Sequence, residues 1–382
     1  MLLIKNVRLF APEDRGMQDI LIFGEKILAV NHGIDPVLSG LSSLGEVEVW
    51  DAGGRRAVPG LIDQHVHVTG GGGESSFSSR VPEIQLSSIL RAGVTTVVGV
   101  LGTDSRTRSV QNLVAKTKAL QEEGITAFCL TGAYEHPSPT ITGNVGDDIV
   151  FIREVLGVKI AISDHRCSQL TREELTRLAA EVRIAGLLSG KPGVVHLHTG
   201  RSGQGLSLIF DVLQSSPIPI RHFRPTHCCN CPEDALRFAS LGGLIDFTSD
   251  DEPLPVARQI AKALEEAPEG HVTLSSDSNG SMPKWGPGQE LIGITAAKMT
   301  SLYKTVLCLH RECGVGFSEA VSLCTQNTAR ALDLYPRKGC IAPGSDADIL
   351  LLDDALQIDG VIARGRVMMR EKELLAKGRY ED

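Results

Sequence analysis

Two histidines separated by one residue, His65 and His67, close the apolar run that begins at Gly60. In a β-strand, side chains alternate between the two faces, so both imidazoles would lie on one face near the strand's C-terminal end. Neutral imidazoles are common zinc ligands, and the pair could hold a divalent metal. Because a His-x-His pair also occurs by chance, this interpretation needs further ligands elsewhere in the chain.

Further metal-binding side chains close other apolar runs of the sequence. His198, His227 and Asp277 each stand at the end of a run that could form a strand. A single histidine at a strand end is more often a hydrogen-bonded core residue than a ligand. Four histidines and an aspartate at corresponding strand ends would, however, meet at one edge of a parallel sheet, where active sites form. The set therefore predicts a metal centre.

Lys159 is the one charged residue in the run Gly157–Ile162. Burial of a bare ammonium group is costly, so the pKa of this lysine should fall. A neutral lysine can react with CO₂ to give a carbamate, which is an anionic ligand able to bridge two cations. The alternative is a lysine that extends from a sheet edge towards solvent.

Eight strand-like runs, alternating with helical stretches, must position these side chains. Helices are predicted at Arg172–Leu188 and Pro232–Leu241. The alternation favours a parallel (β/α)₈ barrel of the TIM type. The competing fold, an open doubly wound sheet, lacks its glycine-rich phosphate-binding motif here. The eight runs are Gly60–His67, Val94–Val100, Ala127–Tyr134, Val158–Ser163, Val194–Thr199, Ile220–His227, Leu244–Ser249 and Val272–Asp277.

The two ends of the chain are both rich in short strand patterns. We expect residues 1–52 and 337–382 to pair into one small β-sandwich domain, with residues 53–336 forming the barrel. The predicted terminal strands are Met1–Leu9, Asp19–Ile22, Lys26–Asn31, Glu46–Asp51, Asp348–Leu352, Ile358–Ala363 and Arg366–Arg370.

Composition limits the possible classes of protein. A net charge of −8 without a basic block argues against nucleic acid as a partner. No apolar run approaches the roughly 20 residues of a membrane helix, and the N-terminal segment predicts a strand rather than a secretory signal. Nine scattered cysteines favour reduced thiols in a cytoplasmic protein. Cys228, Cys229 and Cys231 include a CxxC pair, for which ordinary thiols are favoured over a structural metal or redox pair.

Taken together, these residues resemble the amidohydrolase superfamily, and within it the isoaspartyl (β-aspartyl) dipeptidase family, over essentially the whole chain. The resemblance implies two divalent metal ions, most simply Zn²⁺, and a homo-oligomer. His65, His67 and Asp277 would hold one ion, His198 and His227 the other, and carbamylated Lys159 would bridge them. The family has a glycine two residues after its ligand, so Gly200 selects His198 over His196, which we interpret as structural.

The family's reaction is hydrolysis of the isopeptide bond of β-aspartyl dipeptides through a metal-bridging hydroxide. Two cations lower the pKa of a shared water and polarise the amide carbonyl. Asp277 would then also take the proton and deliver it to the leaving amine. Tyr134 matches the family residue that donates to the carbonyl oxygen, although packing is the default role of a single tyrosine.

Substrate residues also follow from the resemblance. Glu74 ends the Gly70–Gly73 run and would bind the substrate α-amino group, helped by Thr103 and Ser281. Glycine-rich loops can instead cradle anions or simply be flexible. Arg166 suits the α-carboxylate of the aspartyl unit.

The sequence departs from the family at Asn230, where a second arginine is expected. Arg166 could suffice, Arg201 or Arg224 could substitute, or the substrate could differ. A cyclic amidase or an N-acyl-amino-acid deacylase of the same superfamily is the alternative function, and a non-catalytic scaffold is the alternative of a different class.

Overall fold

Eight strands alternate with helices through the middle of the chain in the computed structural model, which describes residues 1–35, 40–285 and 291–381. Each strand overlaps one of the eight predicted runs. The prediction was wrong at the start of the sixth run, because residues 220–222 form a 3₁₀ turn before the strand begins. The strands are β6 (Leu61–Val66), β7 (Val94–Gly99), β8 (Thr126–Gly132), β9 (Val155–Ile162), β10 (Val194–Thr199), β11 (Phe223–Thr226), β12 (Ile245–Thr248) and β13 (Val272–Ser275).

These strands form a curled parallel sheet. Six of them pair in the order β11-β10-β9-β8-β7-β6, and β12 pairs with β13. The buried carboxylate of Asp246 on β12 ties the two groups together, since it accepts hydrogen bonds from Thr226 on β11 (2.7 Å) and Gln64 on β6 (2.7 Å). A parallel bridge between Val66 and Ser278 also joins β6 to the segment after β13. All eight strands therefore point their C-terminal ends towards one side.

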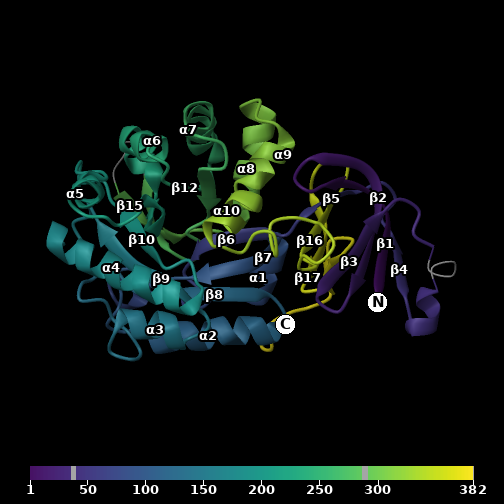
Figure 1. Ribbon diagram of the computed structural model, residues 1–382, viewed down its shortest axis with the longest axis horizontal. Helices are drawn as coiled ribbons and strands as arrows, with labels where there is room; N and C mark the ends of the chain where they lie inside the picture. The colour runs from purple at the N-terminus through teal and green to yellow at the C-terminus, as the bar shows by residue number, and fades with distance from the viewer. Residues whose placement is uncertain (36–39, 286–290, 382) are drawn as a thin grey trace.

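Helices cover the outer face of this sheet (Figure 1). The predicted helices at residues 172–188 and 232–241 are confirmed as α4 and α6. Thr171 caps α4, accepting from the backbone N–H of Glu174, whose side chain reaches back to the backbone N–H of Thr171. The helices are α1 (Leu86–Arg91), α2 (Val110–Glu123), α3 (Val145–Phe151), α4 (Arg172–Ser189), α5 (Ser207–Ser215), α6 (Pro232–Ser240), α7 (Pro253–Glu266), α8 (Thr300–Glu312), α9 (Phe317–Ser322) and α10 (Gln326–Ala331).

Strands from both ends of the chain share a second, nine-stranded sheet. Its order is β19-β18-β17-β16-β5-β1-β2-β3, with β4 paired to β1. In Figure 1 the purple N-terminal strands accordingly lie beside the yellow C-terminal ones. The strands are β1 (Leu2–Phe10), β2 (Asp14–Phe23), β3 (Lys26–Asn31), β4 (Glu48–Asp51), β5 (Arg56–Pro59), β16 (Ile349–Leu352), β17 (Ile358–Ala363), β18 (Arg366–Arg370) and β19 (Glu373–Leu374).

Strand β16 shows how this sheet is held against the rest of the molecule. Its side chains alternate between two cores: Ile349 and Leu351 pack with the N-terminal strands, whereas Leu350 and Leu352 pack with the core beneath the helices. A strand buried on both faces reads as a continuous apolar run, which is the pattern of residues 349–352. The pairing of the chain ends is confirmed, while their arrangement as a sandwich stays a prediction.

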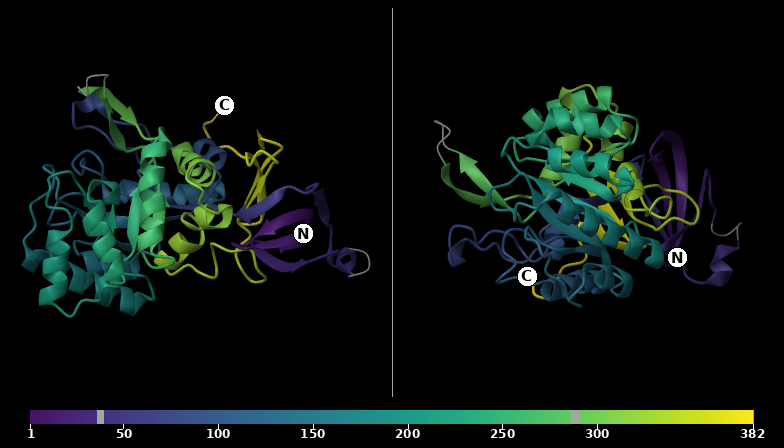
Figure 2. Two further views of the ribbon diagram at one scale, coloured as in Figure 1. Left: turned by 90° about the horizontal axis from the view of Figure 1, so that it is seen from above. Right: turned by 60° about the vertical axis from the view of Figure 1, so that its left-hand side comes forward.

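A two-stranded hairpin, β14 (Ser281–Trp285) and β15 (Leu291–Ala296), follows β13 and stands out from the body of the molecule in both views of Figure 2. Its base lies against the glycine-rich loop, because Gly71 N donates to Asn279 O (2.8 Å). Within the described residues, no helix is long and apolar enough to cross a membrane.

Candidate metal centre

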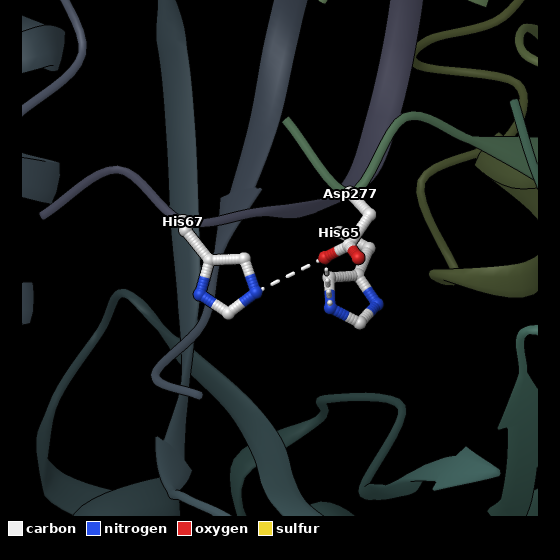
Figure 3. A group of neighbouring side chains, drawn as sticks. All are labelled: His65, His67 and Asp277. Atoms are coloured by element: carbon white, nitrogen blue, oxygen red, sulfur yellow. Dashed lines mark hydrogen bonds and ion pairs between the residues drawn. The ribbon is translucent and has the colours of Figure 1, made fainter. Parts of the chain in front are cut away.

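His65, His67 and Asp277 converge at the C-terminal ends of β6 and β13. The Asp277 carboxylate faces both imidazole rings (Figure 3), with Oδ1 3.0 Å from His67 Nε2 and 3.3 Å from His65 Nε2. Their ligand atoms all lie within 4.8 Å of one another, a group that could hold a metal ion. Burial raises the carboxyl pKa, but the hydrogen bond from His67 and the nearby histidines outweigh burial and lower the pKa of Asp277 below its usual value.

Close packing fixes the orientation of His67. A Cβ atom at Gly102 would lie 2.9 Å from the ring, and one at Gly280 would lie 3.0 Å from it, so both glycines leave room for the imidazole. The buried Nδ1 atom of His67 has no hydrogen-bond partner among the described residues. His65 is held differently, since its Nδ1 atom lies 3.0 Å from His196 Nε2. His196 thus contacts His65 from β10, in keeping with a structural role.

Lys159 lies in the middle of this cluster rather than at an edge. It is fully buried on β9, and its Nζ atom is 3.0 Å from His65 Nε2. Burial lowers the pKa of Lys159 to about 7, because a desolvated ammonium group is disfavoured. The amine is therefore neutral in a large fraction of molecules near neutral pH, as carbamate formation requires.

Within two residues after the end of each of three strands, a non-glycine residue has left-handed backbone geometry. These residues are Ser163 after β9 (φ 56°), His227 after β11 (φ 60°) and Asp277 after β13 (φ 53°). Such conformations cost about 1–3 kcal/mol and gather at functional sites, where the surrounding structure maintains them. The turn directs the side chains of His227 and Asp277 over the end of the sheet.

His198 and His227 lie beside the first cluster, with ring centroids 4.5 Å apart. His227 donates to or accepts from Thr248 Oγ1 through Nδ1 (2.6 Å). Both ring nitrogens of His198 are engaged: Nδ1 with Tyr134 Oη (2.7 Å) and Nε2 with Asp164 Oδ2 (2.9 Å). Binding of a cation by His198 therefore requires one of these two hydrogen bonds to be exchanged.

Asp164 is a site residue that the sequence analysis missed. Its carboxylate accepts from Arg166 Nε (2.9 Å) and Nη2 (2.8 Å), and it also contacts His198. Burial alone would raise its pKa, but the hydrogen bonds from Arg166 and His198 hold the pKa of Asp164 well below the usual range. Its place two residues before Arg166, after β9, was the available signal. Asp164 orients the guanidinium, which lies 5.4 Å from the Tyr134 ring centroid.

The predicted substrate residues Glu74, Thr103, Ser281 and Arg166 come together on one atom. Glu74 Oε1 accepts from Ser281 Oγ (2.8 Å) and Thr103 Oγ1 (3.3 Å), and it lies 3.4 Å from Arg166 Nη1. The side chain of Glu74 is only 21% exposed. The loop that carries it is held by the buried Arg108, which donates to the carbonyl oxygens of residues 69, 71 and 81. Glu74 is therefore a fixed carboxylate beside the histidine cluster.

Asn230 lies at the same end of the sheet, in the 3₁₀ turn after His227. Of the two arginines suggested as substitutes for the missing family residue, Arg224 is buried and donates to Gln64 Oε1 and to Ala331 O. Arg201 is exposed and donates to Asn230 Oδ1 (3.1 Å). The three neighbouring cysteines are free thiols.

Comparisons with known proteins agree with the resemblance to amidohydrolases. The model of the Amidohydrolase family matches residues 56–368. A structure of the β-aspartyl dipeptidase of Fervidobacterium islandicum AW-1, in complex with the dipeptide β-Asp-Leu, is 40% identical, covers 98% of each chain and has a TM-score of 0.90. A D-hydantoinase structure from Thermus sp. shares the fold at 17% identity, with 100% and 98% of the two chains covered and a TM-score of 0.68. L-hydantoinase of Paenarthrobacter aurescens is 22% identical over 94% of this chain and 86% of its own.

Proposed function

The chain belongs to the amidohydrolase family and is a hydrolytic enzyme, and from this membership we propose that it cleaves the isopeptide bond of β-aspartyl dipeptides. One observation carries the proposal. A fixed carboxylate, Glu74, and a guanidinium, Arg166, lie 3.4 Å apart beside the histidine cluster. An aspartyl unit linked through its side chain presents a free ammonium and a free carboxylate on one carbon atom, which matches this pair of charges.

We propose two divalent ions, most simply Zn²⁺, at this site. The residues present fit them: His65, His67 and Asp277 offer converging nitrogen and oxygen ligands, and His198 and His227 lie next to them. Carbamylated Lys159 would supply the shared ligand between the two sets. When bound, such ions lower the pKa of a coordinated water and polarise the substrate carbonyl.

The chain's own residues perform the proton transfers and the positioning. The ionised Asp277 accepts the proton released by the attacking water and passes it to the leaving amine nitrogen. Tyr134, which is buried so that its pKa is raised, keeps its hydroxyl proton and donates it as a hydrogen bond to the carbonyl oxygen. For this it exchanges its present hydrogen bond with His198.

Substrate recognition is assigned to the loops after β6, β7, β9 and β13. Glu74 binds the α-amino group, with the hydroxyls of Thr103 and Ser281 holding the carboxylate in place. Arg166, oriented by Asp164, binds the α-carboxylate through Nη1, the nitrogen that its ion pair with Asp164 does not use and that lies 3.4 Å from Glu74 Oε1.

For the fold, we propose that the eight strands make a (β/α)₈ barrel spanning residues 53–336, of which β5 (Arg56–Pro59) pairs instead in the nine-stranded sheet. Residues 1–52 and 337–382 would form the separate small β-sandwich domain, whose own core supports this division. Assembly as a homo-oligomer and a cytoplasmic location stay predictions from the sequence.

Glu74→Gln tests the proposed function at the ammonium site. Loss of a charge-assisted hydrogen bond costs about 1.5–3 kcal/mol, so kcat/KM for β-Asp-Leu should fall about ten- to a hundred-fold. Metal content should not change, because Glu74 lies outside the proposed ligands. Glu135→Gln is a matched control, since Glu135 pairs with Arg106 and Ser105 rather than with the site.

The N-acetylated dipeptide lacks the ammonium group, so Glu74→Gln should change its turnover little. An equal loss on the acetylated and the free dipeptide would show that Glu74 does not select the ammonium.

A further inference from the structure

The guanidinium of Arg201 is anchored through its Nε atom. Its Nε atom donates to Asn230 Oδ1 (3.1 Å), and Asn230 Nδ2 in turn donates to Thr199 O (2.9 Å). Both functional groups of the Asn230 amide are thus used within the protein. The link runs from the loop after β10 to the turn after β11, next to His198 and His227.

The Nη1 and Nη2 atoms of Arg201 have no protein partner in the described ranges 1–35, 40–285 and 291–381, and the residue is exposed. Arg166 and Arg224, the two other arginines considered for substrate binding, differ. Arg166 gives Nε and Nη2 to Asp164, and Arg224 is buried among Gln64 and Ala331. Arg201 therefore offers a free two-nitrogen edge, which is the geometry that binds a carboxylate bidentately.

Arg166 and Arg201 also differ in whether their partner neutralises the positive charge. Asp164 is an anion, so its ion pair with Arg166 is close to neutral. Asn230 is a neutral amide, which fixes Arg201 through one hydrogen bond and leaves its full positive charge. An uncompensated cation that is anchored beside the site attracts an anionic group more strongly than a paired one.

We propose that Arg201 binds a carboxylate of the dipeptide substrate and that Asn230 is its positioning residue. This inference rests on the proposed function. β-Asp-Leu carries one ammonium group and two carboxylates. Glu74 would bind the ammonium group and Arg166 would bind one carboxylate, which leaves the other carboxylate without a partner. A carboxylate of the substrate is assigned to the free edge of Arg201, which Asn230 anchors beside His198 and His227. The carboxylate is either the α-carboxylate of the aspartyl unit, shared with Arg166, or the terminal carboxylate of the leaving residue.

The test compares wild type, Arg201→Gln and Asn230→Ala on three substrates. β-Asp-Leu has both carboxylates, β-Asp-leucinamide lacks the terminal one, and β-Ala-Leu lacks the α-carboxylate. Arg201→Gln should raise KM for β-Asp-Leu about ten- to a hundred-fold and change kcat much less. The rise in KM should be close to zero for the one substrate that lacks the carboxylate bound by Arg201. That substrate therefore identifies which of the two carboxylates Arg201 binds.

Asn230→Ala should show a smaller rise in KM with the same substrate dependence, because it removes only the anchor. Arg106→Gln, which alters an exposed arginine paired with Glu135, is the matched control and should leave KM unchanged. Equal metal content and thermal stability exclude a folding defect. An unchanged KM for Arg201→Gln, or an equal rise in KM on all three substrates, would overturn the role of Arg201. The proposed function would still stand in that case if wild type cleaves β-Asp-Leu. Failure of wild type to cleave β-Asp-Leu would instead remove the proposed function.

Discussion

Lys159→Ala is expected to lose bound metal and activity together. The proposed carbamate is the ligand shared by two cations, and its removal leaves several buried imidazoles without an anion between them. Because metal ions contribute several kcal/mol to such reactions, kcat/KM for β-Asp-Leu should fall about a thousand-fold or more. Metal content per chain and hydrolysis rate are the two readouts.

Lys118→Ala is the matched control, because Lys118 is an exposed lysine paired with Glu154. Full metal occupancy together with full activity in Lys159→Ala would show that no bridging carbamate is needed. Carbamate formation also requires the neutral amine. With the pKa of Lys159 lowered to about 7 by burial, the neutral fraction rises as pH increases through 7. Metal uptake by the apoprotein should therefore be faster at pH 8 than at pH 6, and should depend on added bicarbonate.

Asp277→Asn is expected to reduce kcat about a hundred- to ten-thousand-fold, the usual contribution of a positioned acid–base group. The amide keeps an oxygen near His65 and His67 but cannot accept the proton, so kcat should fall more than KM rises. Steady-state kinetics on β-Asp-Leu at saturating zinc measure both quantities.

Asp250→Asn provides the comparison, because Asp250 also follows a strand end but, among the residues that the structure describes, accepts a hydrogen bond only from the nearby backbone N–H of Glu252. If Asp277→Asn kept kcat within a few-fold of wild type at full metal occupancy, proton transfer would have to be assigned to another group.

The convergence of the candidate ligands could be predicted because it depends on local patterns. Apolar runs with a period of two place alternate side chains on one face, and parallel strands bring their C-terminal ends to the same edge. Those two rules were enough to bring His65, His67, Lys159 and Asp277 together. The same reasoning found the pairing of the chain ends, since both carry short strand patterns around turns.

Partners set by three-dimensional packing could not be predicted. Nothing local in the sequence shows that Asp164 reaches His198 on β10, or that Asn230 anchors Arg201 across two loops. These contacts join residues far apart in the sequence, and the paths of the loops involved depend on turns with unusual backbone geometry such as the one at His227. The 3₁₀ turn before β11 was missed for a related reason, because a short run after prolines carries too little periodicity to separate a turn from a strand.

The proposed selection of an aspartyl unit linked through its side chain is measured directly by one panel of substrates. Zinc-loaded wild-type protein is assayed on β-Asp-Leu, α-Asp-Leu, γ-Glu-Leu, N-acetyl-leucine and hydantoin. We expect the highest kcat/KM for β-Asp-Leu, with α-Asp-Leu lower because its free side-chain carboxylate and its ammonium group are not on one carbon atom. A higher kcat/KM for hydantoin or N-acetyl-leucine than for β-Asp-Leu would overturn this selectivity and make the protein a cyclic amidase or a deacylase.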